Sequence, residues 1–100
     1  MDDGDTVFHE NPYAWNKNAS VIYLDQPAGI GLSWCNTTED CASGDYASSY
    51  DNIDVLKTWF ERFPDRKTND LYLSGESYAG IYVPYLLWQI DTYNNDEATE

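Results

Sequence analysis

The chain has 100 residues, a formal net charge of −13 and an aromatic content of 16%. This negative charge argues against nucleic acids and anionic membranes as partners, because both would repel it. The composition is that of a folded protein, and no window of about 18 uninterrupted apolar residues is present that could span a bilayer.

The first ten residues are acidic and contain the single histidine of the chain, His9. They have neither the basic start nor the apolar core of a signal peptide, so none is expected in this chain. A lone histidine near a chain end is typical of a solvated surface residue.

Residues 20–25 form the first predicted strand. Their near-continuous apolar run, Val21-Ile22-Tyr23-Leu24, is typical of a parallel strand that is buried on both faces. Residues 25–31 contain one proline and two glycines, which predict a loop after the strand. Loops at the carboxyl ends of parallel strands form the ligand crevice of an open sheet, so we expect this loop to lie beside the functional site.

A helix is predicted over residues 45–63. Asp45 is a suitable N-cap, apolar residues then recur at spacings of three and four, and Pro64 ends the pattern. A second strand is predicted over residues 70–74 and a second helix over residues 78–90, so that a right-handed crossover joins two parallel strands. The last ten residues are expected to form a polar, acidic tail with nothing to pack against.

Two cysteines and two glycosylation acceptor patterns occur in polar segments. Cys35 and Cys41 flank a short loop, and they are a candidate disulfide, free thiols or partners of cysteines outside this chain. The acceptor patterns begin at Asn18 and Asn36. Together these features indicate an oxidising, secretory history. We therefore expect a parent protein whose signal lies upstream of Met1, with this chain as a truncated piece.

The serine motif at residues 71–80, LYLSGESYAG, carries the clearest chemistry. It predicts a strand, a sharp turn and a helix with Ser77 at the apex, which is the layout of a nucleophile elbow. Such a turn strains the serine backbone and requires small neighbours, here Gly75, Ala79 and Gly80. The same letters also occur at ordinary polar turns between a strand and a helix, so the pattern alone does not establish catalysis.

Three blocks occur in order: residues 11–16 with 21–34 (NPYAWN and VIYLDQPAGIGLSW), residues 51–64, and residues 75–84 (GESYAGIYVP). In composition, order and spacing they resemble the serine carboxypeptidases, the carboxypeptidase Y-like branch of the α/β-hydrolases. Leu32 and Trp34 stand where Phe and Tyr are more usual. The resemblance implies an α/β fold class, in which residues 1–100 are a partial α/β-hydrolase domain: a β-α-β-α unit with parallel strands.

The resemblance further implies a serine-type carboxypeptidase that removes C-terminal residues from peptides through an acyl-enzyme on Ser77, with no metal and no organic cofactor. In that family the backbone N–H of Tyr78 contributes to the oxyanion hole, and Gly75, Glu76 and Tyr78 contact the substrate. The triad Asp and His follow the nucleophile, beyond the last residue of this chain, and His9 precedes it. His9 is therefore not expected to be the base, and the isolated chain is expected to be inactive.

Glu76 separates a carboxypeptidase from a generic esterase. By the resemblance it lies near the free terminal carboxylate of the substrate, and two carboxylates sit together only if one is protonated, which favours acidic pH. Residue chemistry alone supports equally well a solvated glutamate whose charge suits the start of a helix.

Other functions stay open. The chain is alternatively a non-catalytic remnant or a peptide-binding fragment, and less favourably an esterase or lipase of the same fold. The expected partner is a peptide with a free C-terminal carboxylate, with no nucleic acid and no membrane span, and the expected location of the parent protein is vacuolar, lysosomal or secreted. Because two parallel strands leave two open edges, we expect the isolated chain to aggregate or to be molten.

Overall fold

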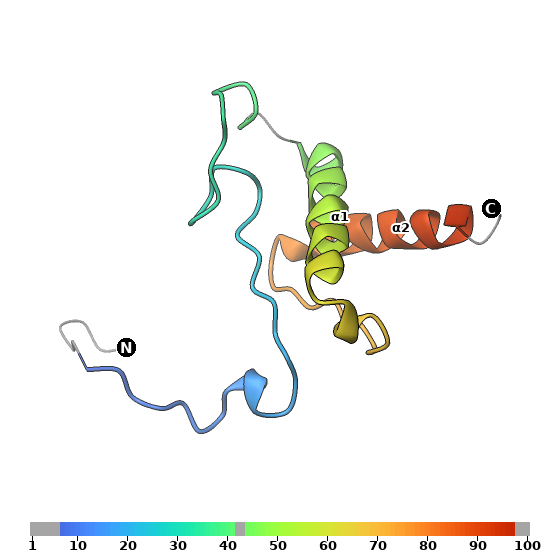
Figure 1. The fold of residues 1–100 in the computed structure, drawn as a ribbon. Helices are drawn as coiled ribbons and strands as arrows, with labels where there is room; N and C mark the ends of the chain where they lie inside the picture. The colour runs from blue at the N-terminus through green and yellow to red at the C-terminus, as the bar shows by residue number, and fades with distance from the viewer. Residues whose placement is uncertain (1–6, 42–43, 98–100) are drawn as a thin grey trace.

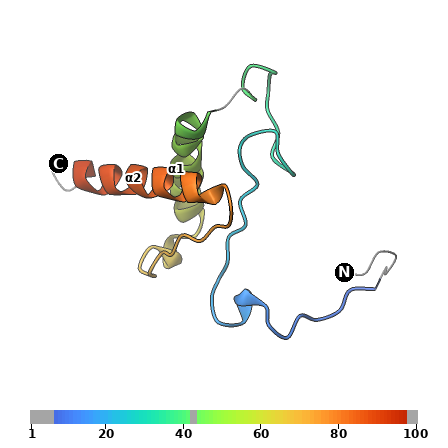
Figure 2. The same ribbon diagram turned by 180° about the vertical axis from the view of Figure 1, so that it is seen from behind.

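The computed structural model describes residues 7–41 and 44–97, and its regular structure is helical (Figure 1). A short 3-10 helix, η1 (Trp15–Lys17), is followed by α1 (Asp45–Arg62), a second 3-10 helix, η2 (Pro64–Arg66), and α2 (Ala79–Glu97). The two long helices cross steeply, and most of the segment ahead of α1 runs outside this pair as an extended trace (Figures 1 and 2).

The predicted parallel α/β fold is wrong for this chain, because the described residues contain no strand. Residues 20–25 and 70–74 lack regular secondary structure and do not pair with each other. A strand forms only when a neighbour accepts its ladder of hydrogen bonds, and a lone parallel pair is marginal even when it forms. In the apolar run at 21–24, Val21 is half-buried and the other three residues are exposed. The apolar residues indicate a segment that is suited to burial. They do not provide the neighbouring strand with which this segment would pair.

The helices differ from their predicted bounds in two respects. Gly44, rather than Asp45, is the N-cap of α1, and Asp45 is its first residue. The predicted acidic tail is wrong over residues 91–97, which continue α2. Asn95 donates a hydrogen bond to Asp91 one turn earlier (3.2 Å), and the Lys57 ammonium lies 4.7 Å from the centre of the Tyr93 ring. These contacts extend the helix past the predicted end at residue 90.

Residues 98–100 of the predicted tail and residues 1–6, on which the expectation about a signal peptide rests, lie outside the described residues. Neither of the two long helices, over the residues described, has the length and apolarity needed to cross a membrane.

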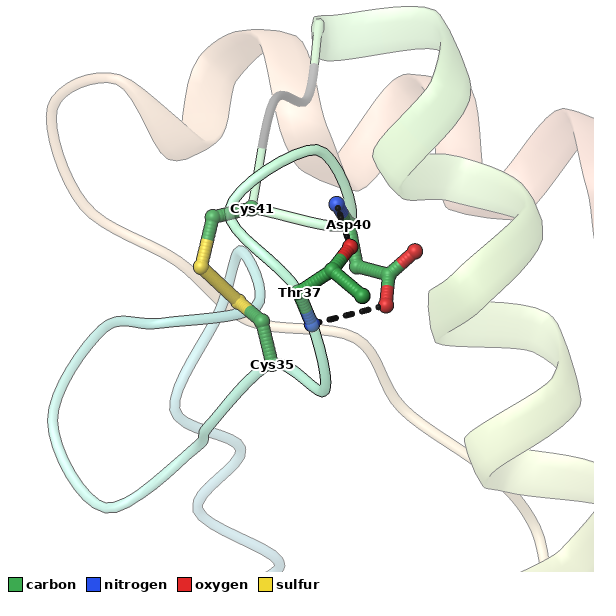
Figure 3. The surroundings of a disulfide bond; sticks show 4 residues. All are labelled: Cys35, Thr37, Asp40 and Cys41. Atoms are coloured by element: carbon green, nitrogen blue, oxygen red, sulfur yellow. Dashed lines mark hydrogen bonds between the residues drawn. A yellow bond between two sulfur atoms is a disulfide. The ribbon is translucent and has the colours of Figure 1, made fainter.

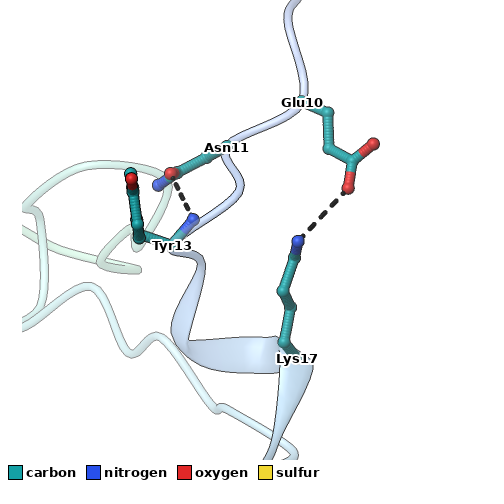
Figure 4. A network of polar contacts seen from close by, with 4 residues as sticks. All are labelled: Glu10, Asn11, Tyr13 and Lys17. Atoms are coloured by element: carbon teal, nitrogen blue, oxygen red, sulfur yellow. Dashed lines mark hydrogen bonds and ion pairs between the residues drawn. The ribbon is translucent and has the colours of Figure 1, made fainter.

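The segment around η1 is held by local polar contacts (Figure 4). The Asn11 side chain accepts a hydrogen bond from the backbone N–H of Tyr13 (2.9 Å), and Lys17 forms an ion pair with Glu10 (3.4 Å). All of these contacts lie on the surface, so they shape the segment locally and contribute little to the stability of the whole chain.

The buried residues lie on α1 and α2, and most of them are polar. The buried residues of the described chain are Ser48, Ser49, Asn52, Leu56 and Gln89. The Gln89 side chain donates to the Ser49 hydroxyl (3.0 Å), which donates in turn to the backbone carbonyl of Tyr46 (2.6 Å). Within the described residues, every buried side-chain N or O atom has a partner. The crossing thus contains a satisfied polar contact between α1 and α2, beside which the Tyr46 ring packs against Tyr85 and Trp88.

Large apolar side chains remain exposed elsewhere. Leu32 is 93% exposed and Phe8 is 91% exposed. The radius of gyration is 16.3 Å, against about 13 Å for a compact domain of this length. Residues 7–41 and 44–97 therefore contain little hydrophobic core.

The crossing predicts the effect of a larger side chain at Ser49, which is only 1% exposed. Ser49→Leu should destabilise the helix pair by about 1–3 kcal/mol, because the added methyl groups overfill a closed contact. Ala47→Leu places the same side chain at an exposed position of the same helix and should change stability little. Thermal unfolding followed by circular dichroism at 222 nm distinguishes the two variants; equal melting temperatures would contradict the close contact.

Candidate active site

The turn that leads into α2 contains Ser77, the only residue other than glycine with a positive φ in the described part of the chain (φ 58°). This left-handed conformation costs a residue with a Cβ atom about 1–2 kcal/mol. Ser77 is exposed. A strained backbone at an exposed serine, directly before a helix, is the local geometry that a nucleophile elbow requires.

Gly75 makes this turn sterically possible. A Cβ atom at position 75 would overlap Cβ of Ala79 and come within 3.1 Å of Cγ2 of Val83. At Gly80, in contrast, an added Cβ atom would meet no atom within 4 Å. The expectation that small residues are needed here therefore has a steric reason at positions 75 and 79, and the described residues give none at position 80.

Three consecutive backbone hydrogen bonds close the turn. They run from Ala79 N–H to the Glu76 carbonyl (3.2 Å), from Gly80 N–H to Ser77 (3.0 Å) and from Ile81 N–H to Tyr78 (2.9 Å). Within the described residues, the backbone N–H of Tyr78 has no hydrogen-bond acceptor. The same holds for the N–H groups of Glu76 and Ser77, so the turn leaves several backbone donors free around the serine, at the positive end of α2.

The Tyr78 side chain is held from two directions. Its hydroxyl donates to the carboxylate of Asp45, the first residue of α1 (2.8 Å), and its ring packs edge-on against Tyr82 (5.0 Å between centroids). The hydrogen bond to Asp45, and secondarily partial burial, raise the pKa of Tyr78 above its usual value. Glu76, on the other side of the serine, is exposed.

The loop at residues 25–33 is folded around the side chain of Asp25. The Asp25 carboxylate accepts a hydrogen bond from Leu32 N–H (2.8 Å), and the Ser33 hydroxyl donates to the Asp25 carbonyl (2.6 Å). Gly31 has a positive φ of 58°, and a Cβ atom there would overlap the Asp25 carboxylate. The absence of a side chain at position 31 is thus a condition for this loop conformation.

The same loop lies against α1. The Asn52 side chain donates a hydrogen bond to Gln26, and a cavity of about 410 Å³ lies between this loop and one face of α1. None of the residues that line this cavity belongs to the turn at residues 75–78. The observed neighbour of the loop is therefore α1; its expected place beside the serine remains a prediction.

Cys35 and Cys41 form a disulfide, with 5.6 Å between their Cα atoms (Figure 3). Within the bridged loop, the backbone N–H of Thr37 donates a hydrogen bond to the Asp40 carboxylate (3.1 Å). The backbone N–H of Asp40 donates in return to the Thr37 hydroxyl (3.2 Å). The bridge lies over Gly29, where a Cβ atom would come within 2.9 Å of the Cys41 sulfur. The sequence left open a disulfide between these two cysteines, free thiols, or pairing with cysteines outside this chain. The structure has the disulfide between Cys35 and Cys41.

The candidate residues named from the sequence therefore do not all lie at one site. Gly75, Glu76, Ser77 and Tyr78 lie together in the turn before α2. The acceptor positions Asn18 and Asn36 are both exposed and lie outside it. No group of residues suited to binding a metal is present among residues 7–41 and 44–97.

Asp45 contacts the serine turn, and this contact was not predicted from the sequence. Its position at the start of a helix already explained an acidic residue there. No signal in the sequence connects it with Tyr78, 33 positions away.

The steric argument at the turn predicts opposite effects for two similar substitutions. Gly75→Ala should destabilise the turn by about 1–3 kcal/mol, because the new methyl group overlaps Ala79. Gly80→Ala should be neutral or stabilise α2 by up to about 1 kcal/mol, since its new methyl group meets nothing. Equilibrium unfolding measures both. If the two variants were equally stable, the contact between positions 75 and 79 would not control the turn.

Comparison with known proteins gives a family for the whole chain. A family model described as serine carboxypeptidase matches residues 1–100. Serine carboxypeptidase-like 26 of Arabidopsis thaliana is 51% identical over 85 residues, which are 84% of this chain and 19% of the relative. Serine carboxypeptidase-like 36 of the same plant is 45% identical over 96% of this chain and 20% of the relative.

Serine carboxypeptidase 1 of Hordeum vulgare is 45% identical over 82% of this chain and 16% of its own length. The chain therefore spans about a fifth or less of the curated relatives that it matches. No solved structure matches it. The family match over all 100 residues, together with identities of 45–51% to these relatives, shows that the chain belongs to the serine carboxypeptidase family.

Proposed function

We propose that Ser77 is the nucleophile of a serine-type carboxypeptidase of which this chain forms a part. The observation that carries the proposal is the left-handed backbone of Ser77 in a member of this family. A conformation that costs free energy at a serine, rather than at a neighbouring glycine, calls for a functional reason. Presentation of the hydroxyl for attack supplies that reason.

In the proposed reaction the Ser77 oxygen attacks the carbonyl carbon of the last peptide bond. The tetrahedral intermediate collapses to an acyl-enzyme and releases the C-terminal residue as an amine, and water then hydrolyses the ester. The backbone N–H of Tyr78, which has no acceptor among the described residues, donates to the developing oxyanion. No metal or organic cofactor takes part.

A serine hydroxyl needs a base to accept its proton. The single histidine of the chain, His9, precedes the serine by 68 positions, whereas in hydrolases with this elbow the histidine follows it. We therefore propose that the base lies outside these 100 residues and that the chain alone does not catalyse the reaction.

The disulfide and the two exposed acceptor asparagines support a location in the secretory pathway, leading to the vacuole, the lysosome or the exterior. Asn36, which directly follows Cys35 in the bridged loop, is one exposed candidate for a glycan. At Asn18, the Ser20 hydroxyl of the acceptor pattern is engaged by Arg66 at 3.4 Å.

The test uses two polypeptides: the 100-residue chain, and the longest protein that the surrounding reading frame encodes. In the longer protein a fluorophosphonate probe should label Ser77, and Ser77→Ala should lower the release of C-terminal residues from blocked dipeptides by about 10⁴-fold or more. Ser74→Ala is the matched control, because it removes an exposed hydroxyl three residues earlier from a backbone without positive φ.

Neither the isolated chain nor the Ser77→Ala protein should react with the probe. If the longer protein failed to react as well, the non-catalytic interpretation would replace this one. If it hydrolysed esters while sparing peptides with a free terminal carboxylate, the chain would belong to an esterase.

The proposed role of Glu76 is to donate a hydrogen bond from its protonated carboxyl group to the terminal carboxylate of the substrate. Glu76→Gln supplies a donor that does not titrate, so KM for a peptide acid should rise less between acid and neutral pH than in the unmodified protein. Glu61→Gln, an exposed change on α1, is the control. An unchanged ratio of KM at the two pH values would leave Glu76 as a solvated residue.

A further inference from the structure

The hydrogen bond between Tyr78 and Asp45 joins the turn before α2 to the start of α1. The two residues are 33 positions apart, and the distance between the tyrosine hydroxyl and the carboxylate oxygen is 2.8 Å. Tyr78 directly follows the strained serine. The contact therefore connects a separate helix to a residue of the turn whose backbone N–H is a free donor.

Asp45 is not needed to cap its own helix. The N-cap is Gly44, whose carbonyl accepts hydrogen bonds from both the backbone N–H and the hydroxyl of Ser48 (2.9 and 3.0 Å). The carboxylate of Asp45 accepts from Tyr78, and Asp45 is itself half-buried. A favourable interaction with the helix dipole accounts for a negative charge at this position, but it does not require a partner on another element.

The contact restricts the peptide plane between Ser77 and Tyr78. The Tyr78 hydroxyl is held by Asp45 and its ring packs edge-on against Tyr82, while the Ser77 carbonyl, which shares a peptide plane with the Tyr78 N–H, accepts a hydrogen bond from Gly80 N–H (3.0 Å). With the Tyr78 side chain and the Ser77 carbonyl both held, the peptide plane that carries the Tyr78 N–H has little freedom to rotate. Donors to an oxyanion are effective when their direction is fixed before the charge develops.

We infer that Asp45 is a positioning residue of the active site, which acts through Tyr78 to aim the Tyr78 backbone N–H at the oxyanion. This inference rests on the proposed function of Ser77. It assigns to α1 a role in transition-state stabilisation, with no contact between α1 and the substrate. The raised pKa of Tyr78 is consistent with it, since the phenol then keeps the proton that it donates.

The experiment compares Asp45→Ala, Asp45→Asn, Tyr78→Phe and the Asp45→Ala/Tyr78→Phe double variant in the longer protein. Rates are divided by the amount of serine that the fluorophosphonate probe labels, so that misfolded protein does not count. Asp45→Ala and Tyr78→Phe should each lower kcat for a blocked dipeptide by about five- to tenfold, with KM changed by less than about twofold.

The double variant should be no slower than either single variant, because both remove the same hydrogen bond. Asp45→Asn keeps an oxygen that accepts from the phenol and should retain at least about half of kcat, although it removes the charge that interacts with the helix dipole. Asp51→Ala removes an exposed acid from the same helix and should leave kcat unchanged.

Three results would overturn the inference. The first is an unchanged kcat in Asp45→Ala while Ser77→Ala is inactive, which would leave the proposed function intact. The second is equal loss in Asp45→Asn and Asp45→Ala, which would assign the effect to the helix dipole. The third is a protein whose serine neither reacts with the probe nor hydrolyses peptides, in which case the proposed function fails and the inference fails with it.

Discussion

The left-handed backbone at Ser77 is the constraint on which the arrangement of the site depends. It exists because Gly75 has no side chain and Ala79 has a small one, so the chain can reverse direction within a few residues and enter α2 at once. A β-branched or long side chain at either position would force the turn open. The strain is local, and the three hydrogen bonds that close the first turn after the serine offset part of it.

The second requirement is that α2 keeps its place relative to α1. Gln89 and Ser49 meet here through one buried hydrogen bond, and the Tyr46 ring packs against Tyr85 and Trp88 (5.8 and 5.6 Å between centroids). Polar contacts of this kind contribute modestly to stability but are directional, because a shifted helix would leave buried donors without acceptors. The crossing therefore fixes position more than it supplies free energy.

The sequence predicts the features that are encoded over short distances. The spacing of apolar residues indicates a helix from Asp45, and Gly75 with Ser77 indicates the sharp turn. The strands at residues 20–25 and 70–74 are wrong because a strand depends on a distant partner, whereas its apolar letters describe only the segment itself. The contact of Asp45 with Tyr78 escapes prediction for the same reason: each residue has a sufficient local explanation.

This difference in range also explains how a chain whose described residues are mostly exposed retains the sequence motif of its family. The features of the proposed site, a strained serine, a glycine two residues earlier and a free N–H after it, lie within four consecutive positions and need no sheet to form. A general base must instead approach the serine from a distant part of the polypeptide, and His9, the single histidine, precedes it in the chain. The backbone geometry that exposes the serine hydroxyl and the presence of a base that activates this hydroxyl are therefore separate properties. The first is encoded within the turn, and the second requires contacts that bring a base within hydrogen-bond distance of the hydroxyl.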